Sequence, residues 1–155
     1  MTVIPEHVLE TLHTLEKAGF EAYIIGGSVR DILLNRVPKD WDVATNALPD
    51  QILELFPDSV YENSFGTVGV KYRFPEDVTE IIEVTTYRTE SGYDDHRRPE
   101  EVEFVSTLDQ DLARRDFTVN ALAMDSTGKV TDRVGGVADL EGRLLQTVGD
   151  PVERF

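Results

Sequence analysis

Two aspartates one residue apart, Asp40 and Asp42, follow a glycine-serine turn in the segment GGSVRDILLNRVPKDWD, residues 26–42. In an extended strand side chains alternate between faces, so both carboxylates are predicted to project the same way, about 7 Å apart at the backbone. Carboxylates at that spacing can share Mg²⁺ ions. Gly26 and Gly27 let backbone amides approach an anion, and the next helix begins with unpaired N–H groups. The segment therefore predicts a site for metal and triphosphate.

A third carboxylate is needed to hold two metal ions firmly, and Glu83 is the candidate. It alternates with Ile82 and Val84 in the strand-like segment IIEVTTYR. Burying a carboxylate without a partner is costly. Glu83 is therefore predicted either to join the two aspartates at the metal ions or to pair with an arginine, for which Arg30 and Arg88 are the candidates.

The segment RRDFTVNAL, residues 114–122, carries a second group of polar side chains. Helical spacing would place Asp116 and Asn120 on one face. The guanidinium groups of Arg114 and Arg115 suit phosphate oxygens, and the Asp and Asn suit ribose hydroxyls. Taken alone, the segment is better explained as a solvated charged helix. The order of the whole set, from glycine turn to paired carboxylates to paired arginines, favours a nucleotide site.

Composition narrows the class of protein. The 155 residues fit one domain, and the absence of cysteine excludes a disulfide framework, a thiolate zinc site and a cysteine nucleophile. The formal charge of −15, from 30 acidic and 15 basic residues, argues against a surface that binds nucleic acid unaided, although simple solubility explains the excess as well. No apolar run approaches the roughly 20 residues that cross a bilayer, and the start lacks a secretory signal. We expect a cytoplasmic protein without a membrane partner.

Apolar periodicity and turn residues predict an α/β domain of the α+β type, in which a small mixed sheet is flanked by helices. Val29, Ile32 and Leu33 are expected on the inner face of the helix after the glycine turn. The polar residues 86–99 lack periodicity and are expected to form a mobile loop that could gate the site. The other expected elements are helices over 5–18, 49–56 and 108–124, strands over 20–25, 60–61, 67–74 and 79–87, and short elements with glycine turns over 130–147.

These segments resemble, in the same order, the catalytic head domain of the class II tRNA nucleotidyltransferases, or CCA-adding enzymes, and of the related bacterial poly(A) polymerases. Both groups belong to the polymerase-β nucleotidyltransferase superfamily. The resemblance covers almost the whole chain, and the motifs that carry it are GGSVRD with DWDVAT, IEVTTYR, the loop with DDHRRP, RRDFTVNALA and GGVADLEGRLLQTVGDPVERF. It implies a polymerase-β-like head domain over residues 1–155.

The resemblance also implies roles for single residues. Asp40 and Asp42 would bind the catalytic Mg²⁺ ions, and Glu83 would complete the cluster. The 3′-hydroxyl of a tRNA would attack the α-phosphate of CTP or ATP, and pyrophosphate would leave. The loop over residues 88–98 would help to switch between nucleotides. The nucleotide-binding set would be Gly26, Gly27, Ser28, Arg30, Arg114, Arg115, Asp116 and Asn120.

The sequence departs from the family after GDPVERF, where these enzymes continue into neck, body and tail domains. The resemblance therefore implies an excised or designed head domain, or one half of a split enzyme, with tRNA binding that needs further domains or a partner chain. CCA addition, C-only addition, A-only addition and poly(A) addition stay open. A non-catalytic nucleotide-binding module, inactive without the missing domains, is the alternative of a different class.

Overall fold

The computed structural model describes residues 4–62, 66–90, 102–115, 117–146 and 148. The strands are β1 (Ala22–Ile25), β2 (Asp42–Thr45), β3 (Ser59–Tyr61), β4 (Thr67–Phe74), β5 (Val78–Thr86), β6 (Arg88–Glu90), β7 (Val102–Phe104), β8 (Leu122–Met124) and β9 (Val130–Asp132). The helices are α1 (Glu6–Lys17), α2 (Gly27–Leu33), α3 (Pro49–Leu55), α4 (Leu108–Ala113), the 3₁₀ turn η1 (Thr118–Asn120) and α5 (Gly136–Glu141). None of the helices in these described stretches is long and apolar enough to cross a membrane.

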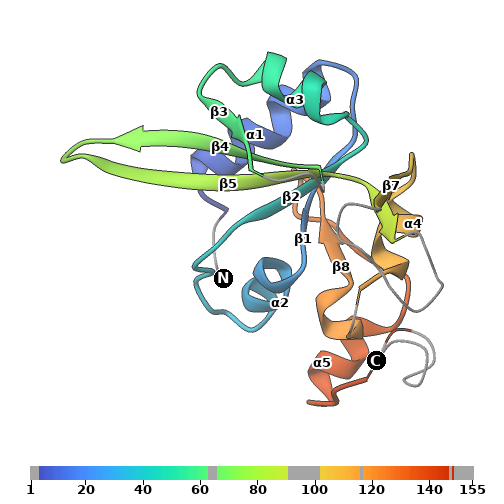
Figure 1. The fold of residues 1–155 in the computed structure, drawn as a ribbon. Coiled ribbons are helices and arrows are strands. Elements are labelled where there is room, and N and C mark those ends of the chain that lie inside the picture. The colour runs from blue at the N-terminus through green and yellow to red at the C-terminus, as the bar shows by residue number, and fades with distance from the viewer. Residues whose placement is uncertain (1–3, 63–65, 91–101, 116, 147, 149–155) are drawn as a thin grey trace.

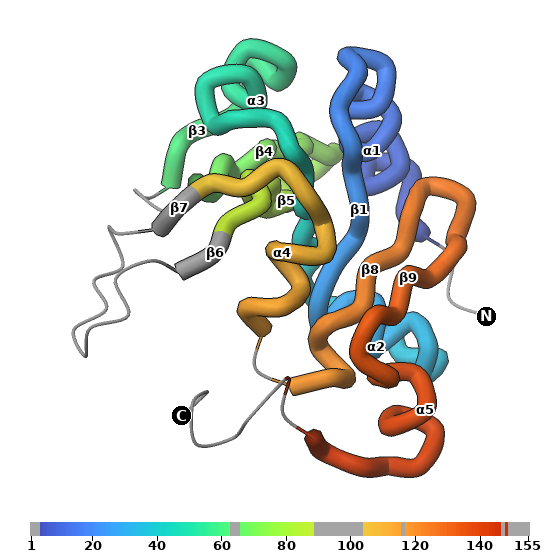
Figure 2. The backbone as a smooth tube through the Cα atoms, turned by 90° about the vertical axis from the view of Figure 1, so that its right-hand side faces the viewer, coloured from blue at the N-terminus to red at the C-terminus, as the bar shows by residue number. Residues whose placement is uncertain are grey.

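Seven strands form one mixed sheet in the order β3-β4-β5-β2-β1-β8-β9 (Figure 1). β2 and β5 run parallel, and the other neighbours in this sheet are antiparallel. β6 and β7 form a separate antiparallel pair. Figure 2 shows β8 lying beside β1, although about a hundred residues of chain separate them. The predicted mixed sheet flanked by helices is confirmed, and β8 and β9 extend it.

The two faces of the sheet pack against different helices. Ile24 and Val43 belong to the main core, to which α1, α2 and α3 contribute side chains. Their neighbours Ile25 and Ala44 point to the other face and join a smaller cluster with α4. The helix expected over residues 5–18 is present as α1, which buries Val8, Leu12 and Leu15 fully in the main core and packs Leu9 at its edge.

The helix predicted over residues 108–124 is wrong. Among the described residues of this stretch only α4 is α-helical, and the stretch ends in β8, where Ile24 pairs with Met124 and Ile25 with Ala123. The last four residues, 121–124, are all buried. A short, continuously apolar run fits a buried strand or a helix equally well by periodicity, so pairing with β1 decides its structure.

Two smaller expectations also need correction. Leu33 is 37% exposed, because it is the last residue of a short helix and lies past the face that Val29 and Ile32 bury. The loop expected over residues 86–99 does not start where predicted, because Thr86 ends β5, Tyr87 is fully buried and β6 follows it. The Tyr87 hydroxyl donates to a carboxylate oxygen of Glu21 at 2.9 Å. Residues 91–101 lie outside the described part of the chain.

Candidate active site at the ends of β1 and β2

The glycine turn joins β1 to α2. Gly26 has φ +72° and ψ −137°, a conformation that side-chain-bearing residues rarely adopt. Its N–H donates to the carbonyl of Leu122 in β8 at 3.1 Å. A methyl group on Gly26 would lie 3.5 Å from Nη1 of Arg115, and one on Gly27 would lie 3.3 Å from Nη2 of Arg30. The turn therefore brings backbone close to two guanidinium groups.

Ser28 and Arg30 take up different positions on α2. Ser28 is buried, and its hydroxyl donates to the carbonyl of Ile25 at 3.1 Å. Arg30 donates to Oδ1 of Asn120 at 3.0 Å and to Oδ1 of Asp31 at 3.2 Å. The structure thus brings Arg30 and Asn120 together across 90 residues, while the Ser28 hydroxyl points into the turn.

The carboxylates lie where β2 begins. β2 and β5 pair in parallel register with Asp42 opposite Glu83, so both side chains lie on one face of the sheet. Ile82 and Val84 point to the buried face, as predicted. The prediction that Asp40 lies on the same strand is wrong, because β2 starts at Asp42 and Asp40 occupies an exposed bend before it.

Burial and mutual repulsion govern the protonation of these acids. Burial raises the pKa of Asp42, the charge of Arg115 opposes that rise, and Asp40 adds to it. The pKa of Glu83 is also raised, first by burial and then by Asp42. Both carboxylates therefore ionise at a free-energy cost that a nearby cation would lower.

Glu62 is an acidic neighbour that the sequence interpretation missed. It follows β3, and its charge raises the pKa of both Asp42 and Glu83. Gly69 in β4 lies opposite Glu83, and a methyl group there would collide with the Glu62 carboxylate. A glycine inside a strand signals a close approach of another group, and this signal could have pointed to Glu62.

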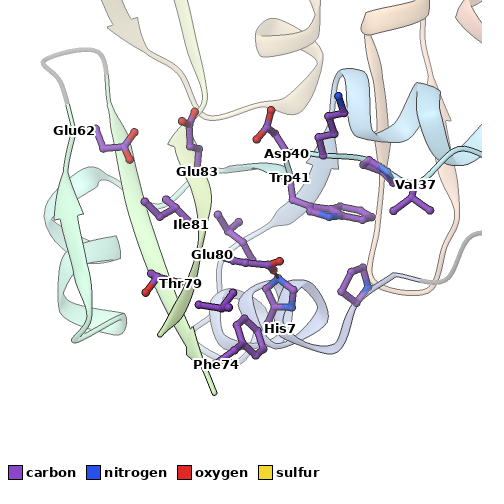
Figure 3. Close-up of a pocket in the computed structure, with 15 residues that line it drawn as sticks. His7, Val37, Asp40, Trp41, Glu62, Phe74, Thr79, Glu80, Ile81 and Glu83 are labelled. Atoms are coloured by element: carbon purple, nitrogen blue, oxygen red, sulfur yellow. Dashed lines mark ion pairs between the residues drawn. The ribbon is translucent and has the colours of Figure 1, made fainter. Parts of the chain in front are cut away.

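An open groove of about 770 Å³ starts at this acidic end (Figure 3). Asp40, Glu62 and Glu83 lie at one end of it, and an ion pair between His7 and Glu80, at 2.7 Å, lies further along. The rest of the lining is partly apolar and includes Val37, Trp41, Phe74, Val78 and Ile81. The groove gives the carboxylates of Asp40, Glu62 and Glu83 access to solvent, whereas Asp42 is not among the residues that line it.

The paired arginines lie at the end of α4. Burial lowers the pKa of Arg115, Arg114 lowers it further, and Asp111 and Asp42 oppose the change. Nε of Arg115 is buried and has no hydrogen-bond partner among the described residues. Asn120 lies in the 3₁₀ turn η1 and not in an α-helix, while the shared face predicted for Asp116 and Asn120 involves a residue that the structure does not describe. Asp116 itself lies outside the described residues.

Two expectations about Glu83 and the metal can be compared with this geometry. Arg30, one of the arginines considered for Glu83, is hydrogen-bonded to Asp31 and Asn120. No group of three His, Asp or Glu side chains within the described stretches is arranged closely enough to hold a metal ion. The pair of Asp42 and Glu83 nevertheless offers carboxylate oxygens side by side, which is the donor type that hard divalent cations prefer.

Comparisons with known proteins agree on one family. The family model described as "Poly A polymerase head domain" matches residues 22–146. The CCA-adding enzyme of Lactobacillus helveticus (strain DPC 4571) is 52% identical over 148 residues, covering 95% of the chain and 36% of the relative. The CCA-adding enzyme of Bacillus pumilus (strain SAFR-032) is 48% identical over 155 residues, covering 96% and 36%.

A solved structure gives the same picture. The crystal structure of the Bacillus stearothermophilus CCA-adding enzyme in complex with CTP is 37% identical, with a TM-score of 0.86. The match covers 99% of this chain and 36% of that one. The chain thus spans little more than a third of the length of these relatives.

Proposed function

The chain belongs to the poly A polymerase head domain family, and on that premise we propose that it is the catalytic head domain of a template-independent RNA nucleotidyltransferase. It adds CMP, AMP or both, from CTP and ATP, to the 3′ end of tRNA in the cytoplasm. The main support is one arrangement: Asp42 lies beside Glu83, the Arg115 guanidinium lies close to the glycine turn, and its charge opposes the rise in the pKa of Asp42 that burial causes. The names of the relatives, CCA-adding enzymes, support tRNA as the substrate.

The glycine turn and the arginines beside it would bind the phosphates of a nucleoside triphosphate. The absence of side chains at Gly26 and Gly27 lets the guanidinium groups of Arg115 and Arg30 lie close to the turn, where they offer positive charge to phosphate oxygens. Arg30 and Asn120, which are hydrogen-bonded to each other, lie beside the turn. Ser28, Arg114 and Asp116 complete the proposed nucleotide-binding set.

The proposed metal ligands are Asp40, Asp42 and Glu83, and the proposed ion is Mg²⁺. Their oxygen donors suit a hard divalent cation, and the pKa values of Asp42 and Glu83 are raised first by burial and then by neighbouring carboxylates, which such an ion would offset. When bound, Mg²⁺ would favour ionisation of the attacking 3′-hydroxyl and neutralise charge on the leaving pyrophosphate.

We assign the head domain to residues 1–155. We assign tRNA binding to the parts of the relatives that the chain does not span. The net charge of −15 supports this division, because an acidic surface repels the RNA backbone. The family description also fits a second candidate function, the head domain of a poly(A) polymerase, and a nucleotide-binding module that is inactive alone is the alternative without catalysis.

An extension assay separates these functions. The chain is incubated with Mg²⁺, a tRNA that lacks its 3′ CCA end, and labelled CTP or ATP in separate tubes. We expect extension that Asp42→Ala abolishes, and that Asp50→Ala, at an exposed aspartate of α3, leaves intact. Long products from ATP alone would identify poly(A) addition. A folded parent chain that binds nucleotide but yields no product at any concentration would contradict catalysis by this chain alone and favour the binding module.

A further inference from the structure

Asp111 is a buried carboxylate that lies between the candidate site and the strand that follows Tyr87. Its side chain is 1% exposed, on the face of α4 that packs against the smaller core cluster. Oδ1 accepts the backbone N–H of Arg88 at 2.9 Å. A carboxylate this buried is stable only with charged or hydrogen-bonding partners, and both arginines of the candidate site supply them.

The two arginines approach opposite oxygens of Asp111. Nε of Arg114 donates to Oδ1 at 3.4 Å, and Nη2 of Arg115 donates to Oδ2 at 3.4 Å. These hydrogen bonds are long, so attraction between the charges holds the groups together more than tight hydrogen bonding does. The spacings of three and four residues put all three side chains on one side of the helix end.

The hydrogen bond from Arg115 to Asp111 uses the Nη2 atom of the guanidinium group. Nη1 points to the glycine turn, 3.5 Å from the position of a methyl group on Gly26, and the charge of Arg115 acts on Asp42. Nε is buried without a hydrogen-bond partner in the described part of the chain. A buried donor without a partner is costly, so the Arg115 guanidinium retains hydrogen-bonding capacity that Asp111 does not use.

We propose that Asp111 is the positioning residue of the triphosphate site, holding Arg115 by one edge so that its other edge faces the glycine turn. This inference rests on the proposed function, because it assigns the anion at the turn to a triphosphate. Asp111 touches no substrate and acts through Arg115. Removing its charge frees a long side chain that otherwise has one orientation, and binding of the phosphates then has to order it.

The test measures binding, so that it does not depend on turnover. CTP and inorganic pyrophosphate are each titrated, with Mg²⁺, into the parent chain, Asp111→Asn and Asp109→Asn by calorimetry. Asp109 is the matched control, since it lies on the same helix, is 65% exposed and pairs with Arg133. We expect Kd to rise about tenfold for both ligands in Asp111→Asn, the size typical of lost supporting contacts, and to stay unchanged in Asp109→Asn.

A double substitution distinguishes positioning from general support of the fold. In an Arg115→Gln background, Asp111→Asn should weaken binding by less than about threefold, because the group that it positions is already gone. A full tenfold loss in that background would overturn the proposal. Should Asp111→Asn fail to fold, Asp111→Glu, which keeps the charge but shifts it, should still raise Kd, and an unchanged Kd would overturn the proposal.

The binding measurements separate a wrong role for Asp111 from a wrong assignment of the triphosphate site. A folded Asp111→Asn variant that binds CTP and pyrophosphate as tightly as the parent would refute the role of Asp111 and leave the proposed function standing. A folded parent chain that binds neither ligand would refute the triphosphate site itself, and the role of Asp111 with it.

Discussion

At the scale of single residues, the candidate site is a cluster of carboxylates that repel one another. Asp42 and Glu83 are neighbours across two parallel strands, and Glu62 adds a third negative charge close to both. Burial and repulsion raise the pKa of Asp42 and Glu83. An arrangement that is unfavourable without a cation is what a metal-dependent enzyme requires, because the same charges then bind the ion.

Asp42→Asn should therefore stabilise the metal-free protein while abolishing activity. A carboxyl group whose pKa is raised by folding costs no stability below its unfolded pKa, near 3.9, and costs most above its folded pKa. At pH 7.5 we expect Tm to rise by about 2–4 °C, for a gain of about 1 kcal/mol, and the gain to vanish near pH 3.5. Thermal melting at the two pH values measures this.

The exposed Asp50→Asn variant provides the control and should show no rise in Tm. Added MgCl₂ should raise the Tm of the parent chain and leave that of Asp42→Asn unchanged, since mass action stabilises only a protein that binds the ion. A lower Tm for Asp42→Asn at pH 7.5, with Asp50→Asn unchanged, would mean that Asp42 stabilises the fold and is not held against repulsion.

At the scale of elements, the glycine turn and the parallel pairing of β2 with β5 assemble the site. The turn starts α2 and lies close to Arg115. The register of β2 and β5 places Asp42 beside Glu83. Segments from residues 26 to 120 meet there, so the site depends on the strand order more than on any single motif.

The substitution Gly26→Ala tests the turn, with Gly19→Ala as the control at a second glycine of positive φ. Gly26 and Gly19 both have positive φ, +72° and +92°, so alanine at either should cost roughly 1–3 kcal/mol of stability. Only Gly26 faces Arg115, and Gly19 has open space around it. We expect urea unfolding to show a loss in both variants, and CTP titration to show weaker binding in Gly26→Ala alone. Equal CTP affinity in both variants would remove the turn from the site.

Features that depend on neighbouring residues in the sequence could be predicted, because each leaves a pattern in a short stretch of chain. A glycine-serine turn, an alternating strand and an amphipathic helix can be read from short windows, and Gly26, Glu83 and α1 were predicted in this way. Asp111 and Glu62 were missed, because their importance comes from contacts with distant elements. The strand at residues 122–124 was taken for helix, since its partner β1 lies far away in sequence.

At the scale of the whole molecule, excess negative charge is the dominant property. The chain carries 30 acidic and 15 basic residues, for a formal charge of −15. Self-repulsion on this scale destabilises the compact state, and it keeps an RNA backbone away from surfaces other than the arginine-bearing site. This is consistent with a domain that recognises the small triphosphate itself.

Sodium chloride should therefore stabilise the chain at neutral pH. Raising NaCl from 0.05 to 0.5 M shortens the Debye length from roughly 14 to 4 Å and screens the repulsion, so we expect Tm to increase by several degrees at pH 7.5. Near the isoelectric point, pI about 4.4, the same salt step should have little effect. Equal salt effects on melting at both pH values would contradict a role for net charge.

The most direct test of the metal and triphosphate site is NMR of the ¹⁵N-labelled chain with CTP, in which Mn²⁺ replaces part of the Mg²⁺. A paramagnetic ion broadens amide signals close to it. The account predicts that the signals of Gly26, Gly27, Asp42 and Glu83 broaden together, while those of the distant Gly19 and Gly128 stay sharp. Broadening confined to other acidic stretches, with Gly26 and Asp42 unaffected, would contradict the site.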